Sequence, residues 1–189
     1  GLRFGLDLSK PLRSVLEDGY QGVELLADFR IQDRFYLAAE LGNEKKDYLE
    51  SNINAITKGS YFKVGLNYNA YLNWAGMTNE IFTGLRYGFS SFSQELLGYD
   101  IYSTNQSFPP TFVSQNIEYT NLNAHWAEFI IGVKTEVLNN VYLSLNLQLK
   151  RKLSEIVPEN FDNLYIPGFN RTYDFSQWGV GYGYNLTYL

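Results

Sequence analysis

Apolar and polar residues alternate with a period of two along most of the chain, and this pattern constrains the fold more than any other feature. The clearest run starts at Val141, from which every second residue up to Leu149 is apolar. The intervening residues, from Tyr142 to Lys150, are almost all polar. Since successive side chains of a strand point to opposite faces, the run predicts a strand with one apolar and one polar face.

Eight segments follow this alternation, and most have the roughly 9–11 residues that a tilted membrane strand needs. They cover residues 2–8, 22–30, 35–42, 62–69, 81–90, 127–134, 141–150 and 178–188. In chain order, the first, third, fifth and seventh connections are long and cover residues 9–19, 43–59, 93–124 and 151–174. The fourth connection, 71–79, is shorter. Long external loops and short periplasmic turns are typical of outer-membrane barrels. The sequence therefore predicts one all-β domain over 1–189, an eight-stranded antiparallel up-and-down transmembrane β-barrel with four long external loops, three short periplasmic turns and periplasmic termini.

The polar face decides which side of the barrel is outside. Alternation alone also fits a soluble lipocalin-like barrel or a sandwich with the apolar face inward. The polar face is rich in glycine, which weakens a water-facing strand but makes room inside a narrow barrel. It also carries charges of both signs that neutralise each other in a closed interior. These are Arg3, Asp7, Glu24, Asp28, Arg30, Glu40, Lys63, Arg86, Glu128, Lys134 and Lys150.

The short turns allow some of these charges to be paired. The turn at 138–140 places Glu128 opposite Lys150, which is a favourable cross-strand pair. The turn at 31–34 places Glu24 beside Glu40, so that one carboxyl must hold a proton or both must meet a cation such as Lys63. One interpretation is a proton or ion path. A packed structural network is favoured, because small barrels are normally filled by side chains.

Aromatic residues make up 17% of the chain and are expected to form a girdle at the membrane surface. Tyr68, Tyr71 and Trp74 gather at one short turn. Tyr184 and Tyr188 are predicted near the same level of the barrel.

The chain resembles small outer-membrane barrels of the OmpA-transmembrane and OmpX type across all eight segments, in pattern rather than in motif. The segments LRFGLDL (2–8) and GLRYGF (84–89) are also similar to an uncharacterised barrel family of Bacteroidota. This resemblance implies an outer-membrane location without a known activity. The chain departs from the usual pattern at its end, where Tyr188-Leu189 replaces a terminal aromatic residue.

Composition excludes several function classes. The net charge of −5 argues against nucleic-acid binding, which needs a basic face. There is no cysteine and only one histidine, so a thiolate site, a thiol nucleophile and a histidine-rich metal site are excluded. Neither a phosphate-binding loop nor a calcium-binding loop is present, and no cofactor is expected.

A lipid A-modifying enzyme is the third alternative for function. The deacylase type of such barrels uses a histidine with a serine two residues on, but Ala127 stands two residues after His125. The acyltransferase type uses histidine, aspartate and serine at the external rim, where Ser91, Ser93 and Asp100 precede His125. These residue types are common in any loop, so no catalytic residue is assigned.

The two longest connections carry more large aromatic residues than solvent-facing loops usually do, which suits a protein interface. The alternative is that these loops pack on each other as a lid. We therefore expect a structural or accessory role in which external loops and the outer wall bind a partner protein within an outer-membrane complex. A narrow channel or small-ligand transporter is the second alternative, and contact with lipopolysaccharide is expected of any such barrel. The candidate interface residues are Tyr99, Tyr102, Phe108, Phe112, Tyr119, Phe161, Tyr165 and Phe169.

Overall fold

The computed structural model describes residues 1–50, 52–71, 79–101, 111–173 and 175–189, except for the side chain of Thr111. The elements are β1 (Leu2–Asp7), α1 (Ser9–Leu16), β2 (Tyr20–Arg30), β3 (Phe35–Leu49), β4 (Ile53–Asn69), β5 (Glu80–Ile101), β6 (Thr111–Leu138), β7 (Val141–Glu155), β8 (Tyr165–Ile166), β9 (Asn170–Arg171) and β10 (Trp178–Tyr188).

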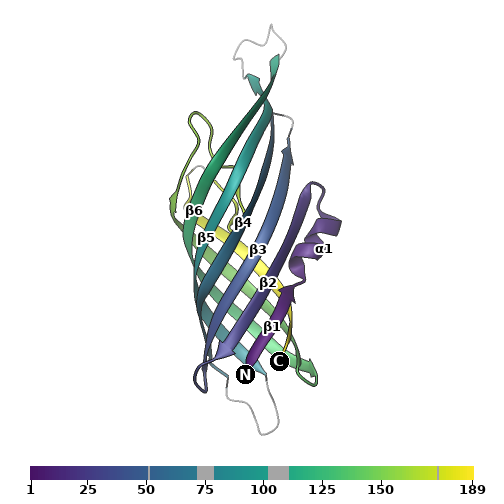
Figure 1. The fold of residues 1–189 in the computed structure, drawn as a ribbon, viewed down its shortest axis with the longest axis vertical. Helices are drawn as coiled ribbons and strands as arrows, with labels where there is room; N and C mark the ends of the chain where they lie inside the picture. The colour runs from purple at the N-terminus through teal and green to yellow at the C-terminus, as the bar shows by residue number, and fades with distance from the viewer. Residues whose placement is uncertain (51, 72–78, 102–110, 174) are drawn as a thin grey trace.

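Eight of the strands form a closed barrel in the order β1-β10-β7-β6-β5-β4-β3-β2, with each neighbouring pair antiparallel. This confirms the predicted ring of eight antiparallel strands. Strands β8 and β9 form a separate small hairpin. Figure 1 shows both chain termini at one end of the barrel, here called the terminal end. The β5–β6 hairpin extends farthest in the opposite direction, toward what is here called the far end.

Several strands are longer than the alternation predicts. The expected 43–59 loop is instead a continuation of β3 and β4, which pair from Phe35–Tyr68 to Leu49–Asn54. Most of the expected 93–124 loop likewise belongs to β5 and β6, which pair as far as Ile101–Thr111. The prediction of long loops at 43–59 and 93–124 was therefore wrong. Toward the far end apolar and polar residues no longer alternate regularly, as in Lys45-Lys46 of β3 and Leu96-Leu97 of β5, so the period-two signal fades although the ladder continues.

Apolar side chains cover the outside of the barrel wall, and ionic side chains fill its inside. The lipocalin-like alternative, which turns the apolar face inward, therefore does not describe this barrel. No helix in the described ranges is long and apolar enough to cross a membrane. The exposed apolar wall residues include Leu2, Phe4, Leu6, Leu25, Leu37, Leu41, Phe62, Val64, Leu66, Leu85, Ile131, Val133, Leu145, Leu147, Leu149 and Val180.

Candidate functional site in the barrel lumen

Four buried charges form an ionic cluster near the terminal end. Arg3 donates from Nε to Asp28 Oδ1 at 2.5 Å and from Nη1 to Glu80 Oε1 at 2.6 Å. Lys134 Nζ lies 2.8 Å from the other oxygen of Asp28. Two cations thus balance two carboxylates inside the wall. Glu80 was not among the predicted interior residues, because it lies just before its predicted strand.

A second cluster surrounds Lys63 in the middle of the lumen. Its Nζ lies 2.5 Å from Glu40, 3.1 Å from Glu24 and 4.0 Å from Glu128. Arg86 Nε reaches the other oxygen of Glu40 at 3.1 Å. The side chain of Lys63 is almost fully buried, so it is the cation that holds three carboxylates together.

The strand register corrects one expected pair and reproduces another. Glu24 lies opposite Gly42 rather than beside Glu40, which is two positions away along β3. At this turn the two strands end at Arg30 and Phe35 as predicted, but Arg30 pairs with Tyr36, and this register separates Glu24 from Glu40. Glu128 does lie opposite Lys150, with Nζ and Oε2 3.9 Å apart.

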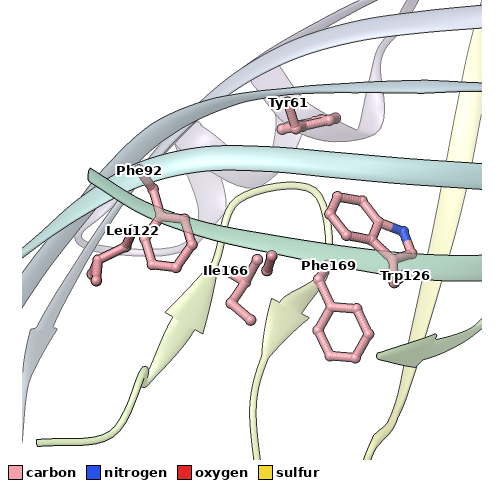
Figure 2. Close-up of a cluster of buried hydrophobic side chains, with 7 residues drawn as sticks. Tyr61, Phe92, Leu122, Trp126, Ile166 and Phe169 are labelled. Carbon is pink, nitrogen blue, oxygen red and sulfur yellow. The ribbon is translucent and has the colours of Figure 1, made fainter. Parts of the chain in front are cut away.

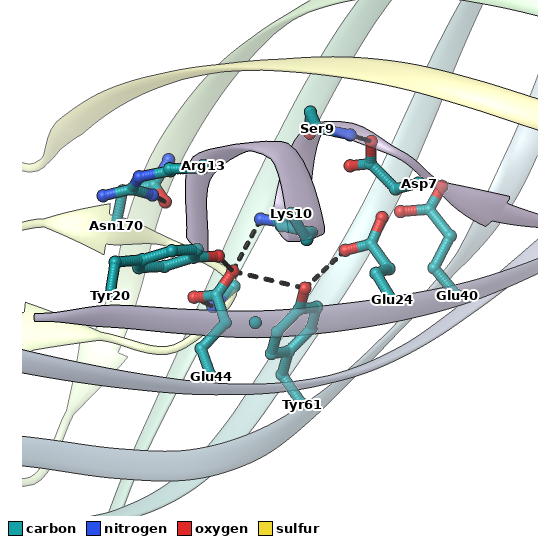
Figure 3. Close-up of polar contacts among 12 residues, drawn as sticks. Asp7, Ser9, Lys10, Arg13, Tyr20, Glu24, Glu40, Glu44, Tyr61 and Asn170 are labelled. Carbon is teal, nitrogen blue, oxygen red and sulfur yellow. Dashed lines mark hydrogen bonds and ion pairs between the residues drawn. The ribbon is translucent and has the colours of Figure 1, made fainter. Parts of the chain in front are cut away.

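Glu44 is the centre of a third network, which joins four separate elements of the lumen (Figure 3). Its carboxylate accepts hydrogen bonds from Lys10 Nζ at 2.6 Å, Tyr20 OH at 2.9 Å, Tyr165 OH at 2.7 Å and the main-chain N–H of Gly168 at 3.0 Å. Burial and the nearby Glu44 charge raise the pKa of Tyr165 well above its ordinary value, so this hydroxyl stays protonated and donates. Glu44, which is 0% exposed, therefore ties α1 to the segment after β7.

That segment, residues 165–171, contains β8 and β9 and is here called the plug segment. Its side chains Ile166 and Phe169 are buried inside the barrel, as Figure 2 shows. Gly168, at φ +80°, lets the backbone turn where a side chain would meet the ring of Tyr61. The plug segment and the wall together form an apolar cluster of Tyr61, Phe92, Leu122, Ala124, Trp126, Ile166 and Phe169.

Helix α1 takes the place of the far half of the first strand in the barrel wall. Strand β1 ends at Asp7, while β2 and β10 on either side of it continue toward the far end. The helix packs between them, mainly against β2. Lys10 is buried, whereas Leu12, Val15 and Leu16 are exposed on the outside. The helix thus repeats the arrangement of the barrel wall, with its apolar face outward.

The sequence contained a signal for α1 that the period-two analysis missed. The apolar residues Leu12, Val15 and Leu16 are spaced for one face of a helix rather than a strand. Pro11 lies in the first turn, where its lack of an N–H has no cost. The first intrahelical bond is donated by Leu12 to Leu8 at 3.1 Å.

Side chains replace part of the missing strand pairing along the junction of α1 with β2 and β10, here called the seam. The N–H of Gly22 donates to Ser14 Oγ at 3.0 Å, and the N–H of Tyr184 donates to Asp7 Oδ1 at 3.1 Å. From the plug segment, the Asn170 amide donates to the carbonyl of Val180 at 3.2 Å. The seam is thus closed by individual polar contacts rather than by a continuous ladder.

Replacing Ser14 by alanine is expected to lower the free energy of unfolding by about 1–2 kcal/mol. The change leaves the Gly22 N–H without its acceptor, a loss only slightly offset by the better helix propensity of alanine. Urea unfolding of the detergent-solubilised barrel measures the effect. Ser91→Ala on the outer face of β5 is the control, and equal destabilisation by both changes would contradict this role of Ser14.

Of the six predicted interface residues that the structure describes, four lie in strands rather than in loops. Tyr99 belongs to β5, while Phe112 and Tyr119 belong to β6. Phe161 stacks on Tyr119 with ring centroids 6.0 Å apart. Two further candidates, Tyr165 and Phe169, are buried in the lumen, and no external interface can include them. Tyr102 and Phe108 lie outside the described residues.

The predicted girdle residues lie on the outer wall where they are described. Tyr68 packs on Phe35 with ring centroids 5.1 Å apart. Tyr71 and Tyr184 line one outward groove, and Tyr188 is exposed. Trp74 lies outside the described residues.

The residues considered for lipid A chemistry do not come together. His125 lies opposite Phe89, and its Nδ1 forms a hydrogen bond with the hydroxyl of Tyr87. Asp100 is eleven residues beyond Phe89 along β5, a separation of roughly 35 Å at the usual rise of a strand. Aspartate and histidine therefore cannot act on the same atom in this arrangement.

Within the described part of the chain, no group of three or more histidine, cysteine, aspartate or glutamate side chains is placed to hold a metal ion. Comparison with curated proteins finds no match, and neither does comparison with solved structures. A family model does match residues 1–189, and its description is a domain of unknown function, DUF6048. The chain therefore belongs to the DUF6048 family.

Proposed function

We propose that this protein is an integral outer-membrane barrel, closed to ions, that holds a partner protein at its far end. The observation that carries the membrane location is the inside-out distribution of side chains. The apolar residues of the wall face outward, while Lys63, Arg86 and their carboxylates are enclosed. A membrane barrel needs this arrangement, whereas water would favour the reverse.

Helix α1 supports the same location independently of the strands. Its exposed face consists of Leu12, Val15 and Leu16, and its buried face provides Lys10. A surface helix of a water-soluble protein carries these residue types on the opposite faces. In a bilayer the same helix continues the lipid-facing wall.

The packing of the lumen supports a closed barrel rather than a channel. In the terminal half, the space among residues such as Asp28, Arg86 and Lys134 is about 30 Å³, enough for one or two water molecules. Toward the far end, the plug segment fills the interior with Ile166 and Phe169. Ions would have to displace buried salt bridges and apolar side chains to pass.

A row of open main-chain groups on β6 supports partner binding. Strand β7 pairs with β6 only between Ala124 and Leu138, while β5 pairs with β6 up to Thr111. Among the described residues, no strand pairs with this edge of β6 from Thr111 to Leu122, and the carbonyl of Asn123 accepts from Ile156. An extended segment of another protein can bind such an edge by adding a strand. This edge has a single charge, Glu118, but the β5–β6 register shifts twice along it, so the regular stretch nearest the tip runs from Thr111 to Ser114.

The direction of the main-chain groups can be assigned near the tip. Asp100 donates its N–H to Asn52 on the β4 side, so the main-chain groups of its β6 partner, Phe112, point away from β5. By the two-residue period, Ser114 opposite Gly98 also directs its N–H to the open edge. Proline at Ser114 removes this donor without removing a β5–β6 hydrogen bond.

The edge is tested with a photo-activated cross-linking amino acid at position 112 in cells that make the protein natively. We expect one discrete protein to be captured at this position. A cross-linker at Leu153, which is exposed on β7, is the control and should not capture it. In a background with Ser114→Pro, capture at 112 should be lost while the barrel still folds. Capture that is unchanged by Ser114→Pro, or none at 112, would overturn strand addition at this edge.

A further inference from the structure

The lumen contains an apolar compartment. A lumen that is only packed with ionic side chains does not need such a compartment. Much of the interior is polar or charged, but Tyr61, Phe92, Leu122 and Trp126 of β4, β5 and β6 point inward and belong to one apolar cluster. Trp126 is fully buried, and its ring covers Gly88, where even a methyl group would collide with it. The inner side of the wall therefore provides an apolar surface. The plug segment occupies that surface with Ile166 and Phe169, two side chains that a ligand of the same character can replace.

This compartment lies directly behind the seam. Phe169 lies against β10, since a methyl group at Gly179 would be 3.0 Å from its ring. The next residue along the plug segment, Asn170, donates to the carbonyl of Val180. The plug segment therefore lies between β10 and the rest of the apolar cluster.

The wall is weakest at the seam. Tyr184 directs its main-chain groups toward α1, because its carbonyl accepts from Leu8 and its N–H donates to Asp7. Because the direction of main-chain groups repeats every two residues along a strand, Tyr182 and Val180 also direct theirs toward α1. No described residue is hydrogen-bonded to the main chain of Tyr182 on that side. The exposed fractions of Val180 and Tyr182, 74% and 61%, are also high for this wall. Separating α1 from β10 therefore breaks fewer main-chain hydrogen bonds than separating two paired strands of the wall.

One carboxylate is bonded to both movable parts. Glu44 binds α1 through Lys10, and it binds the plug segment through Tyr165 and Gly168. Loss of this carboxylate therefore weakens the attachment of the helix and of the plug segment together. These contacts of Glu44 with Lys10, Tyr165 and Gly168 are here called the latch. They are polar and directional, so they can be broken and re-formed without rebuilding the barrel.

We propose that α1 and the plug segment form a lateral gate, and that the compartment behind it binds one acyl chain of a membrane lipid when the plug segment withdraws. The inference rests on the proposed membrane location, because the acyl chain enters from the bilayer. An acyl chain fits because the exposed side of the seam is apolar, with Leu12 and Val180 on its two sides. The compartment also offers aromatic and aliphatic surface of matching character in Phe92, Leu122 and Trp126.

The experiment uses quenching of tryptophan fluorescence in vesicles of phosphatidylcholine with brominated acyl chains. Bromine quenches only tryptophans that the chains approach. The chain has three tryptophans, so Trp74→Phe with Trp178→Phe leaves Trp126 in the lumen as the reporter. With the gate closed, we expect little quenching of Trp126. Glu44→Gln, and separately Ile166→Ala with Phe169→Ala, should each cause a severalfold larger loss of its emission.

Two controls separate the possible outcomes. Glu80→Gln removes a buried carboxylate that pairs with Arg3 and contacts neither α1 nor the plug segment, and it should leave Trp126 unquenched. A second reporter, with all three native tryptophans replaced by phenylalanine and Leu147→Trp in the middle of the outer wall, should be quenched in every variant. If the reporter at position 147 is not quenched, the membrane location fails. If it is quenched but Trp126 stays protected in both gate variants, the membrane location stands and the acyl-chain site is wrong. Folding of each variant is verified by its heat-modifiable electrophoretic mobility.

Discussion

Replacing Lys63 by methionine is expected to lower the free energy of unfolding by about 3–5 kcal/mol. This is the usual cost of removing one partner of a buried ion pair. Lys63 contacts Glu24 and Glu40 and lies 4.0 Å from Glu128. Methionine fills a similar volume, so the lost packing is small and the lost charge accounts for the effect. The three carboxylates then share a closed lumen without their central cation, and Arg86 reaches only Glu40 among them.

The measurement is the free energy of unfolding in urea, with the barrel reconstituted in vesicles. Lys58→Met is the matched control, because Lys58 lies 3.9 Å from Glu118 and both side chains are more than half exposed. An exposed pair of this kind contributes about 0–1 kcal/mol. Adding Glu40→Gln to Lys63→Met should recover part of the loss, since it removes one of the unpaired charges. A Lys63→Met variant no less stable than Lys58→Met would show that the lumen is open to water.

The closed ring of eight strands was predictable because alternation reports directly which face of a strand is buried. Residues 141–150 have an apolar face and a polar face. In the structure, the apolar face lies outside the barrel and the polar face lies inside. The ends of the strands were not predictable by the same reasoning. Lys45 and Lys58 are opposite each other near the far end of β3 and β4, where neither face is apolar. Hydrogen bonding continues there without any pattern in the side chains.

The interior network was predictable only as far as it lies on the predicted strands. The pair of Glu128 with Lys150 follows from one tight turn, and the central position of Lys63 follows from its polar face. Lys10 lies on a helix, Glu44 beyond a predicted strand end, and Tyr165 in a long connection. Their meeting depends on how the chain folds back into the lumen, which period-two reasoning cannot show. Tyr165 and Phe169 looked like external anchors for the same reason, since an aromatic residue in a connection can face either way.

The seam adds a physical point about the wall. Leu8 to Glu17 cannot continue β1 as a regular strand, because Pro11 lacks the N–H that a ladder needs. The helix that forms instead satisfies its own main chain but leaves β10 with few partners. The lumen compensates locally, with Asp7, Ser14 and Asn170 binding main-chain groups of the two flanking strands. A weak wall, an apolar compartment and a polar latch thus occur together because one strand stops early.

Replacing Leu147 by arginine is expected to block stable insertion of the barrel, with a cost of about 2–4 kcal/mol for a lipid-facing arginine near the bilayer midplane. Leu147 is 71% exposed on the outer face of β7, between Ile131 on β6 and Tyr182 on β10. The size of this cost tests the membrane location. For a barrel in water, the same exposed substitution would change the free energy of unfolding by only about 0.5 kcal/mol or less.

Leu153→Arg is the matched control on the same strand and the same outer face. Leu153 is exposed six residues farther along β7, roughly 20 Å from Leu147, and follows Arg151 and Lys152. At that level an added arginine is expected to cost about 0–1 kcal/mol, since it reaches the water-facing surface. Folding into vesicles, followed by electrophoretic mobility and urea unfolding, compares the two variants. Equal behaviour of Leu147→Arg and Leu153→Arg would mean that no bilayer surrounds the middle of the wall, because only an apolar solvent can distinguish two exposed leucines by their depth.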